Sequence, residues 1–521
     1  MKKTIFYTTT YLSIIFTLLV STTYALNGGT LRLNTYNGWK AFEIISEGDN
    51  PSGDGFNYAL PGVFDGAGAW LVDPLTLRVQ LNHEQSDGSI SEVNLNLENF
   101  QTAINNMIVT ASTGGVHFVN SARQAYHRWS NNGGLTWTNT SNTTNTSFTR
   151  FCSGQAYAPN TFGTDRGFVD DIYITGEEFG NDRLFAIDSV NRDFYQLSGV
   201  TGSAAGGIGG MDFDSFENAA LIDTKEDGHV ALLLSPDGGS SSMKLYIGEK
   251  GKAINGSDDS SFLARNGLAY GSWYYLNASY PSLNNTNSGS FDTSSSGALT
   301  SSKLEDVDTS PSDPTQVVLG DQNSGLFTFS FHLNFGGVGG HFSSAASSFT
   351  ITKIQNHIND SNGNFGDADN VDWTDATNLA GNTYADGLIF VNEDTGTQTG
   401  EIWMMMPDGS NLERIADTKS GGPTESSGIF DVSIMVGYTP GSIMITNNQG
   451  SSSMSVLINP EATVNSSCYD FTHFSEIAST WLTHGIDPEY IWYYNFDNTG
   501  QSENKIDEAD LLNFIDHWLC F

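Results

Sequence analysis

Hydrophobic residues in this chain occur in short runs separated by Gly, Asp, Asn and Ser. Many runs come in pairs joined by a turn, and Gly, Asp, Asn and Pro in the turns favour chain reversal. The pattern predicts antiparallel hairpins that pair 172–175 with 184–187, 219–223 with 230–234, 307 onward with 317–320 and then 326–331, 388–392 with 401–406, and 432–436 with 442–446. Two further strands are predicted in 70–81 around Asp73-Pro74.

A succession of hairpins over some four hundred residues predicts an all-β chain. The predicted fold is a β-propeller of about six blades, and a large β-sandwich is the alternative. The 56 glycines and the low charged fraction of 15% agree with many strands joined by tight turns. Residues 101–150 are polar and rich in Asn and Thr, so they predict an insertion with little regular structure.

The first residues are typical of a signal peptide. Lys2 and Lys3 precede an apolar stretch at 11–20, and Thr23-Tyr24-Ala25 predicts cleavage after Ala25. The apolar stretch is too short for a membrane span, and no later segment is long enough. We therefore expect a secreted or periplasmic protein without a membrane span, with a propeller domain at 26–455 and a small domain at 464–521.

The formal charge is −38, from 21 basic and 59 acidic residues. Nucleic acid is excluded as a partner because phosphate contacts need a basic face. Clustered carboxylates in an exported protein bind Ca²⁺, although acidic residues also serve solubility alone.

Cys152 opens a stretch that ends in two adjacent carboxylates, Glu177 and Glu178. The other two cysteines, Cys468 and Cys520, both lie near the C-terminus and can pair, which leaves Cys152 without a partner. A thiolate close to carboxylates indicates a metal site. The alternative is a buried thiol beside a solvated acidic turn.

Acids precede the first strand of three predicted hairpins, at Phe216-Glu217-Asn218, Leu304-Glu305-Asp306 and Ala385-Asp386-Gly387. If these strands line the axis of a propeller, then Glu217, Glu305 and Asp386 converge at one end of the channel. Carboxylates so close together repel each other, and a metal ion offsets that repulsion. The alternative is that acids simply begin strands after turns.

The C-terminal segment contains two amphipathic stretches, 477–482 and 514–519, each preceded by an acidic loop. Residues 495–500 alternate oxygen-bearing side chains and end in Gly, which is typical of a calcium loop. The segment resembles a dockerin module, and the resemblance implies a Ca²⁺ ion near Asp497, Asp507 and Asp510 and a cohesin-like partner. The alternative is a helical hairpin joined by Cys468 and Cys520.

Several motifs together resemble the PhoX family of secreted alkaline phosphatases: Asn82-His83-Glu84, Arg150-Phe151-Cys152-Ser153, Thr175-Gly176-Glu177-Glu178, Phe216-Glu217-Asn218 and Leu304-Glu305-Asp306. The resemblance runs from about 55 to 450 and implies a propeller whose axial site holds Fe³⁺ and Ca²⁺. Carried over by motif, it implies the metal ligands Glu84, Cys152, Glu177 or Glu178, Glu217 and Glu305. Lys303 stands where the family has a phosphate-contacting arginine, and His83 is either an orienting group or a packed histidine.

The resemblance implies a metal-dependent phosphatase that hydrolyses phosphate monoesters, with Cys152, Lys303 and His83 at the reaction centre. Residues 156–170 replace a tryptophan-bearing segment of the family, and Lys303 lacks the two-pronged contact of arginine. The alternative function is a non-catalytic, calcium-binding propeller tethered to an assembly by the dockerin-like tail. A polysaccharide hydrolase is a third interpretation that depends on the tail alone.

Overall fold

The computed structural model describes residues 31–140, 148–178, 182–200, 208, 211, 214–237, 242–280, 282–301, 303–336, 340–359, 361–395, 399–419 and 425–465. The predicted signal peptide and the acids Asp497, Asp507 and Asp510 of the predicted calcium loop lie outside the described residues. No helix among the described residues is long and apolar enough to cross a membrane.

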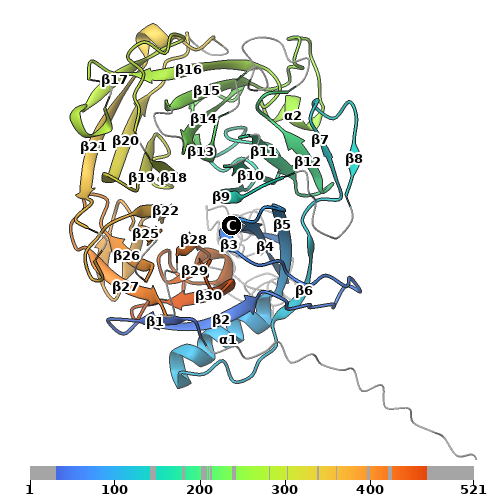
Figure 1. The fold of residues 1–521 in the computed structure, drawn as a ribbon, viewed down its shortest axis with the longest axis vertical. Coiled ribbons are helices and arrows are strands. Elements are labelled where there is room, and N and C mark those ends of the chain that lie inside the picture. The colour runs from blue at the N-terminus through green and yellow to red at the C-terminus, as the bar shows by residue number, and fades with distance from the viewer. Residues whose placement is uncertain are drawn as a thin grey trace, which may run out of the picture.

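The described residues form a β-propeller of six blades arranged around a central axis (Figure 1), so the predicted fold is confirmed. Four blades are separate sheets, and two share one nine-stranded sheet through β17 (Ser288–Asp292). Blade 1 contains β3 (Phe64–Asp73), β4 (Thr76–His83), β5 (Ser89–Asn96) and β6 (Val119–Gln124). Blade 2 contains β9 (Phe151–Tyr157), β10 (Ile172–Glu177), β11 (Leu184–Asp188) and β12 (Asp193–Gln196), with β7 (Arg128–Ser130) and β8 (Thr138–Asn139) outside them.

Blades 3 and 4 are the two halves of the nine-stranded sheet. Blade 3 contains β13 (Phe216–Ile222), β14 (His229–Pro236), β15 (Lys244–Glu249) and β16 (Gly271–Asn277). Blade 4 contains β18 (Leu304–Thr309), β19 (Gln316–Asp321), β20 (Gly325–His332) and β21 (Ser348–Asn356).

Blades 5 and 6 include the first and last strands of the ring. Blade 5 contains β22 (Ala368–Trp373), β25 (Ile389–Glu393), β26 (Glu401–Met405), β27 (Glu413–Thr418) and β1 (Leu33–Thr35). Blade 6 contains β28 (Ser426–Asp431), β29 (Ile443–Asn448), β30 (Ser453–Ile458) and β2 (Lys40–Ser46). Because β2 pairs antiparallel with β30, the N-terminal strand closes the ring around the C-terminal one.

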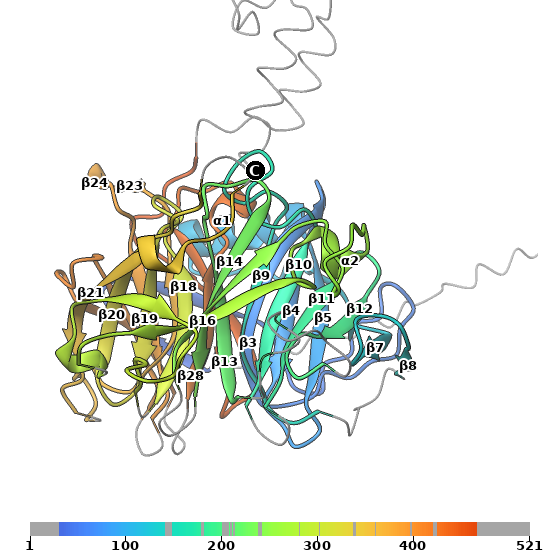
Figure 2. The ribbon, with the colours of Figure 1, turned by 90° about the horizontal axis from the view of Figure 1, so that it is seen from above.

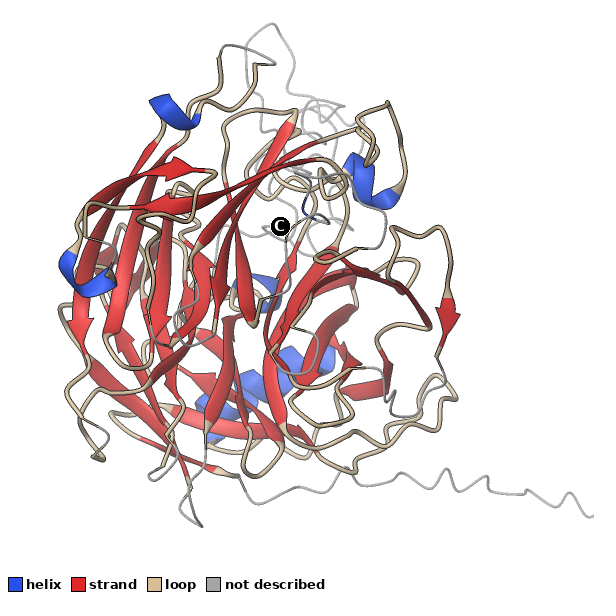
Figure 3. Ribbon diagram, turned by 45° about the horizontal axis from the view of Figure 1, so that its top comes forward, coloured by secondary structure: helices blue, strands red, loops and turns tan. Residues whose placement is uncertain are grey.

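Helices make up a small part of the described residues in this strand-rich fold (Figure 3). They are α1 (Leu97–Thr110), α2 (Phe262–Arg265), η2 (Leu283–Asn285), η3 (Ser344–Ala346) and η4 (Ile434–Val436), and a small hairpin is formed by β23 (Thr377–Leu379) and β24 (Asn382–Tyr384). Seen from the side, the β23–β24 hairpin lies at one face of the disc (Figure 2).

The hydrophobic core lies between the blades. One cluster joins Leu77, Val79 and Leu81 of β4 to Ile443 and Val456 of blade 6, and comparable clusters fill other interfaces. The strand β14 is buried along its whole length because both faces of its sheet are covered by neighbouring blades. The six innermost strands, β3, β9, β13, β18, β22 and β28, contact one another in that order around the axis (Figure 1).

Carboxylates also hold neighbouring inner strands together. Asp306 accepts a hydrogen bond from the backbone N–H of Val371, and Asp308 accepts one from Trp373 in the next blade. The backbone N–H of Asp431 donates in the same way to Asp372. These bonds fix the inner strands of blades 4, 5 and 6 at equal height, so the starts of these strands lie at the same end of the channel.

Most predicted hairpins are present, namely β3–β4, β10–β11, β13–β14, β18–β19–β20 and β25–β26. The hairpin predicted between 432–436 and 442–446 is wrong. The segment Ile434–Val436 is a 3-10 helix, and β29 pairs with β28 instead. Asp431 accepts hydrogen bonds from the backbone N–H groups of Ser433 and Gly441, which ends the strand and starts a tight loop.

The insertion predicted at 101–150 is also wrong in part, because this region contains most of α1 and the outer strands β6, β7 and β8. The helix buries Leu97, Phe100, Ala103 and Ile104, a spacing typical of one helical face. The Asn96 side chain accepts a hydrogen bond from the backbone of Asn99 and caps the helix. The abundant Asn and Thr of this segment obscured that spacing.

Candidate metal centre

Each inner strand begins with an irregularity in its pairing to the second strand of the blade. In blades 1, 2, 4 and 5, two inner-strand residues face one residue of the partner, which is the arrangement of a β-bulge and turns side chains toward the axis. The second residue of each inner strand, which follows its first pair, is, in the six blades in order, Asp65, Cys152, Glu217, Glu305, Asp369 and Ser427. We call this set the bulge ring.

A second set of polar residues comes directly after the second strand of every blade. These residues are Glu84, Glu178, Asp237, Gln322, Asp394 and Gln449, and we call them the turn ring. The strand pairing places each of them at the same end of its blade as the bulge-ring residue. The two rings therefore bring eight carboxylates, one thiol, two amides and one hydroxyl to one end of the channel.

Two groups within these rings have the spacing of metal ligands. One ligand atom from each of Glu84, Cys152 and Glu178 lies within 4.8 Å of the others, and the same holds for Glu217, Asp237 and Glu305. The first group spans blades 1 and 2, and the second spans blades 3 and 4. Sequence positions more than two hundred residues apart thus contribute to one end of the channel.

The first group is held by its immediate neighbours. The Sγ atom of Cys152 donates to Glu178 Oε2 at 3.4 Å, and Gln449 Nε2 donates to Glu84 Oε2 at 2.5 Å. The Nη1 atom of Arg150 lies 3.1 Å from Glu84 and 3.6 Å from Glu178. Arg150 is therefore a counter-ion at this group.

Asn82, the first residue of the Asn82-His83-Glu84 motif, fixes the chain at Cys152. Its Nδ2 donates to the backbone carbonyls of Cys152 and Ser153 at 2.6 and 3.1 Å. Its Nδ2 also donates to Thr175 Oγ1 at 2.9 Å, so one buried amide ties β4, β9 and β10 together. The motif thus joins a structural amide to a carboxylate of the first group.

The second group contains its own basic residue. The Nζ atom of Lys303 donates to Asp237 Oδ2 at 2.6 Å and lies 3.0 Å from Glu305 Oε1. Glu217 Oε1 accepts hydrogen bonds from the backbone N–H and the hydroxyl of Ser153, which connects this group to the Cys152 bulge. Glu305 Oε1 is buried and accepts no hydrogen bond.

The electrostatics of this end of the channel favour the uncharged form of its acids. Burial, followed by the charge of Glu178, raises the pKa of Glu84 to about 7, although Arg150 opposes the shift. Burial and the neighbouring carboxylates raise the pKa values of Glu217 and Glu305 well above their usual range. The same causes raise the pKa values of Asp65, Asp369 and Glu425, which precedes β28.

The Cys152 thiol is affected in the same direction. Burial, and then the charges of Glu217 and Asp65, raise the pKa of Cys152 well above its usual value. Burial of Lys303 opposes its protonation, but the charges of Glu305, Asp237 and Glu217 together outweigh this effect and raise its pKa above the usual range. If all the acids of the rings were ionised, Lys303 and Arg150 could not offset their charge, which is why the pKa values of these acids are raised.

The structure separates the two candidates Glu177 and Glu178. Glu178 belongs to the first group, whereas Glu177 is fully buried and pairs with Arg183, whose Nε lies 2.5 Å from Glu177 Oε2. Alternation along β10 explains the difference, since successive side chains point to opposite faces of a strand. Glu177 therefore contributes to packing between strands and not to either group.

His83 lies away from the carboxylates as a packed residue. Its Nδ1 is 3.0 Å from the Gly62 carbonyl, its Nε2 is 2.7 Å from the Ser91 hydroxyl, and its ring packs edge-on against Phe64. Burial lowers its pKa to about 4, so the ring is neutral. These contacts support the prediction of a packed histidine over that of an orienting group.

Asp386 was predicted to join Glu217 and Glu305, and this prediction is wrong. Asp386 is exposed and precedes β25, which is the second strand of blade 5. The inner strand β22 carries Asp369 at the corresponding position. The sequence pair Asp369-Asn370 repeats Glu217-Asn218, and that repetition was the available signal.

Sequence reasoning also missed Asp65, Asp237, Asp394 and Arg150. Phe64-Asp65-Gly66 has the same pattern as Phe216-Glu217-Asn218, with an aromatic residue, an acid and a small or polar residue. Asp237 and Asp394 become recognisable only when the ends of the second strands are known.

The residues fit the Fe³⁺ and Ca²⁺ that the PhoX resemblance implies. Carboxylate oxygens are suitable ligands for calcium, and a thiolate among them suits iron better than calcium. The buried oxygen of Glu305 accepts no hydrogen bond although Lys303 Nζ lies 3.0 Å away, so it has acceptor capacity left for a metal ion. Glu84, Cys152 and Glu178 would hold one ion, and Glu217, Asp237 and Glu305 another.

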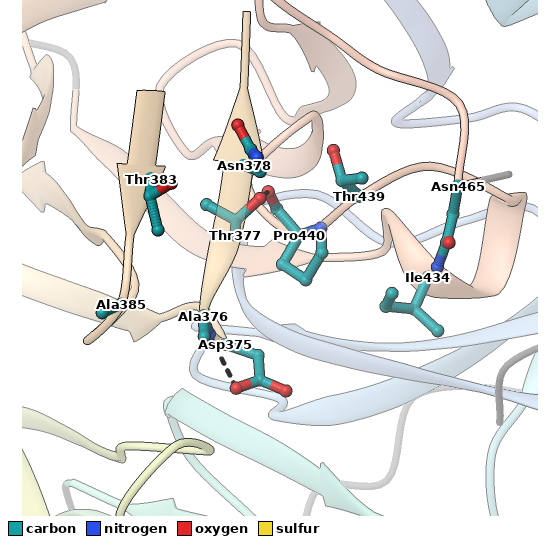
Figure 4. Close-up of a pocket in the computed structure, with 10 residues that line it drawn as sticks. All are labelled: Asp375, Ala376, Thr377, Asn378, Thr383, Ala385, Ile434, Thr439, Pro440 and Asn465. Carbon is teal, nitrogen blue, oxygen red and sulfur yellow. Dashed lines mark hydrogen bonds between the residues drawn. The ribbon is translucent and has the colours of Figure 1, made fainter. Parts of the chain in front are cut away.

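A separate pocket is shown in Figure 4, and its lining includes Asp375 and Ile434, which follow the C-terminal ends of the inner strands β22 and β28. It has a volume of about 440 Å³ and is lined mainly by Thr, Asn and Ala side chains between the β23–β24 hairpin and the loop at Pro440. Its carboxylate, Asp375, accepts hydrogen bonds from the backbone of Ala376 and the hydroxyl of Ser312. The pocket therefore contains none of the candidate ligands.

No family model and no curated protein sequence matches the chain. Among solved structures, Pseudomonas fluorescens PhoX in complex with vanadate, a transition state analogue, shares 12% identity, covers 83% of this chain and 96% of its own, and has a TM-score of 0.50. The β-propeller domain of Swd1 from Myceliophteria thermophila and an arginine mutant of AofleA from Arthrobotrys oligospora share 8% identity. They cover 77% and 82% of this chain and 98% and 90% of their own, with TM-scores of 0.32 and 0.36, which are too low to support an argument. The comparison with PhoX concerns the fold alone, and it places this chain among β-propellers of that shape.

Proposed function

We propose that this protein is a secreted or periplasmic metal-dependent phosphatase of the PhoX type that hydrolyses phosphate monoesters. The observation that supports the proposal is the pair of ligand groups at one end of the channel, Glu84–Cys152–Glu178 and Glu217–Asp237–Glu305. A fold similar to that of PhoX, whose structure was solved in complex with vanadate, a transition state analogue, agrees with it.

Bound Fe³⁺ and Ca²⁺ would act as Lewis acids that offset the charge on the phosphoryl oxygens. The residues of the chain perform the remaining tasks. Cys152 and the carboxylates hold the ions, and Asn82 fixes the backbone from which Cys152 projects. The ammonium of Lys303, whose side chain is 28% exposed, would bind an anionic oxygen of the ester as a point charge.

On this proposal, a phosphate ester would bind only to the metal-loaded protein. Without metal, the carboxylates would repel a dianionic ester, since like charges in a partly buried site are screened only weakly by solvent. Arg150 and Lys303 are both paired with these carboxylates. A phosphate group can therefore approach only after the negative charge has been offset.

The C-terminal segment 464–521 remains a proposed calcium-binding module with a cohesin-like partner. Its candidate ligands Asp497, Asp507 and Asp510 supply hard oxygen atoms. Calcium-dependent binding of the full chain to an immobilised cohesin, lost when the three aspartates are changed to alanine, would support this proposal. Binding without calcium would contradict it.

The catalytic proposal is tested by elemental analysis combined with a panel of phosphate monoesters on the purified mature chain. We expect bound iron and calcium, turnover of the esters, and loss of turnover with a chelator followed by recovery when both metals return. Glu178→Gln should abolish turnover, and the matched change Glu177→Gln should retain it in the folded fraction. Calcium without iron, or full metal occupancy without turnover, would contradict the catalytic proposal and favour a non-catalytic calcium-binding propeller.

A further inference from the structure

Lys303 lies inside the second ligand group. Its ammonium contacts both Asp237 and Glu305, at 2.6 and 3.0 Å. The side chains of these two acids are 6% and 4% exposed, whereas that of Lys303 is 28% exposed. The ammonium of Lys303 therefore contacts two buried acids, while the lysine side chain as a whole keeps some exposure to solvent.

The backbone of Lys303 is anchored, but its side chain is not enclosed in the same way. The Lys303 carbonyl accepts a hydrogen bond from the backbone N–H of Gln322, a residue of the turn ring. A lysine side chain is a flexible chain of four carbons, so its ammonium can move several ångströms while the backbone stays in place. Lys303 can thus turn toward the solvent without a change in the strand.

The contact with Glu305 is incomplete. Glu305 Oε1 is at ion-pair distance from Lys303 Nζ and yet accepts no hydrogen bond, although the oxygen is fully buried. The ligand atoms of Glu217, Asp237 and Glu305 lie within 4.8 Å of one another. An ammonium offers one positive charge there, whereas a calcium ion offers two and contacts several oxygens at once.

We propose that Lys303 is a tethered competitor for the divalent cation at Glu217, Asp237 and Glu305. The ammonium and a calcium ion exclude each other at this group, and the lysine turns outward when the ion is bound. In the outward position Lys303 is available to an anionic oxygen of the substrate. This inference rests on the proposed function and adds that metal binding creates the phosphate contact.

Two consequences follow from this exclusion. Removing the ammonium must strengthen calcium binding, because the ion no longer displaces a competing charge. A phosphate analogue that binds outward-turned Lys303 must also strengthen calcium binding, because coupling between two ligands is reciprocal. The first effect appears when Lys303 is replaced, whereas the second requires Lys303 to be present.

The experiment is calorimetric titration of the metal-stripped full chain with Ca²⁺, with and without phenylphosphonate as a phosphate monoester analogue that is not hydrolysed. Glu305→Gln identifies the binding event that belongs to this group. We expect Lys303→Met to bind Ca²⁺ about tenfold more tightly at that event than the unchanged protein. Phenylphosphonate should tighten binding to the unchanged protein by about tenfold and leave the variant nearly unaffected.

Lys244→Met is the matched control, because Lys244 on β15 is a buried lysine whose ion pair is with Asp214, a residue outside the group. It should lower stability and leave calcium affinity unchanged. Unchanged or weaker calcium binding by Lys303→Met would overturn the inference. Equal responses of the unchanged protein and Lys303→Met to phenylphosphonate would also overturn it, as would the absence of calcium binding by both of them. If the unchanged protein turns over no ester and Lys303→Met still binds Ca²⁺ more tightly, the result would support this inference and contradict the proposed phosphatase.

Discussion

Glu177 and Glu178 are adjacent and chemically identical, and yet they have different roles because the end of β10 turns them to opposite sides. Glu177 Oε2 lies 2.5 Å from Arg183 Nε in the interior of blade 2, and Glu178 faces Cys152 at the end of the channel. Replacing one partner of a buried ion pair costs folding free energy, because the charge of the other partner stays buried without compensation. A ligand that faces the channel can be changed with little effect on packing.

The first prediction follows from this difference. Glu177→Gln should lower the free energy of unfolding by about 3 kcal/mol, since Arg183 loses its buried partner, and should leave metal stoichiometry unchanged in the folded protein. Glu178→Gln should reduce metal content and alter stability little in the metal-free state. Denaturant unfolding and elemental analysis of both variants check the prediction, and loss of metal from Glu177→Gln would reverse the assignment.

The second prediction concerns Cys152. Burial and neighbouring acids raise its pKa, so the metal-free protein holds a protonated thiol at neutral pH. We expect Cys152 to be alkylated at least about tenfold more slowly in the folded protein than in denaturant, as measured by peptide mass spectrometry. Addition of Co²⁺ should release a proton and produce a sulfur-to-cobalt absorption that Cys152→Ser lacks. Equal alkylation rates in the folded and denatured protein would show that the thiol is not buried.

At this scale the sequence indicated Glu84, Cys152, Glu217 and Glu305, which the structure places in two neighbouring groups. The order of the PhoX-like motifs indicated these residues, because each motif lies at the start of the inner strand or at the end of the second strand of a blade. Asp237 and Asp394 could not be predicted, since an acid after a strand is indistinguishable in sequence from any solvated turn residue. Alternation along β10 separates Glu177 from Glu178, but the sequence alone does not reveal which of two adjacent side chains faces the channel.

At the scale of elements, the candidate ligands depend on irregular starts of otherwise regular strands. Gly66 lies in the bulge of β3, beside the bulge that carries Cys152 in β9. A Cβ atom at Gly66 would lie 2.5 Å from the Cys152 carbonyl oxygen, the Gly154 nitrogen and Ser153 Cα. These are backbone atoms, which cannot move without displacing the strand.

The third prediction is therefore that Gly66→Ala lowers the free energy of unfolding by about 1–3 kcal/mol through overpacking and weakens metal binding at the Cys152 group. Gly228→Ala is a suitable control, because a Cβ atom there meets nothing within 4 Å. Thermal unfolding and metal titration of both variants check the prediction. Unchanged metal affinity in a destabilised Gly66→Ala protein would mean that the bulges do not set the ligand geometry.

Hairpins were predictable wherever turn residues and alternating runs coincided, as in β10–β11 and β25–β26. The hairpin predicted at 432–436 failed because Asp431 caps the following loop, and an apolar run such as Val432 to Val436 does not reveal whether its backbone is extended. The strand β2 could not be paired from sequence, since its partner β30 lies some four hundred residues away. Ring closure is a property of the whole chain.

At the scale of the whole molecule, the propeller places buried acids along its axis with few cations to balance them. Burial raises the pKa of Glu84 and Asp306 to about 7 and of Asp308 and Asp431 to about 6. Between the ordinary carboxyl pKa and these values, the folded protein holds protons that the unfolded chain has released. Unfolding therefore releases protons in this range, and stability falls as pH rises. His83, with its pKa lowered to about 4, has the opposite effect, but the acids outnumber it.

The last prediction is that the metal-free protein unfolds at a lower temperature at about pH 8 than at about pH 5, provided that calcium is chelated. Calcium should raise the unfolding temperature strongly at the higher pH and weakly at the lower pH, because protons compete with the ion for the carboxylates. Glu84→Gln should flatten the metal-free profile near neutral pH, since it removes a group that titrates there. Scanning calorimetry with chelator and with calcium measures both effects. A metal-free protein that is more stable at the higher pH, or a calcium effect of equal size at both, would mean that the axial acids are already balanced without metal, and the reason for a metal centre in this channel would be lost.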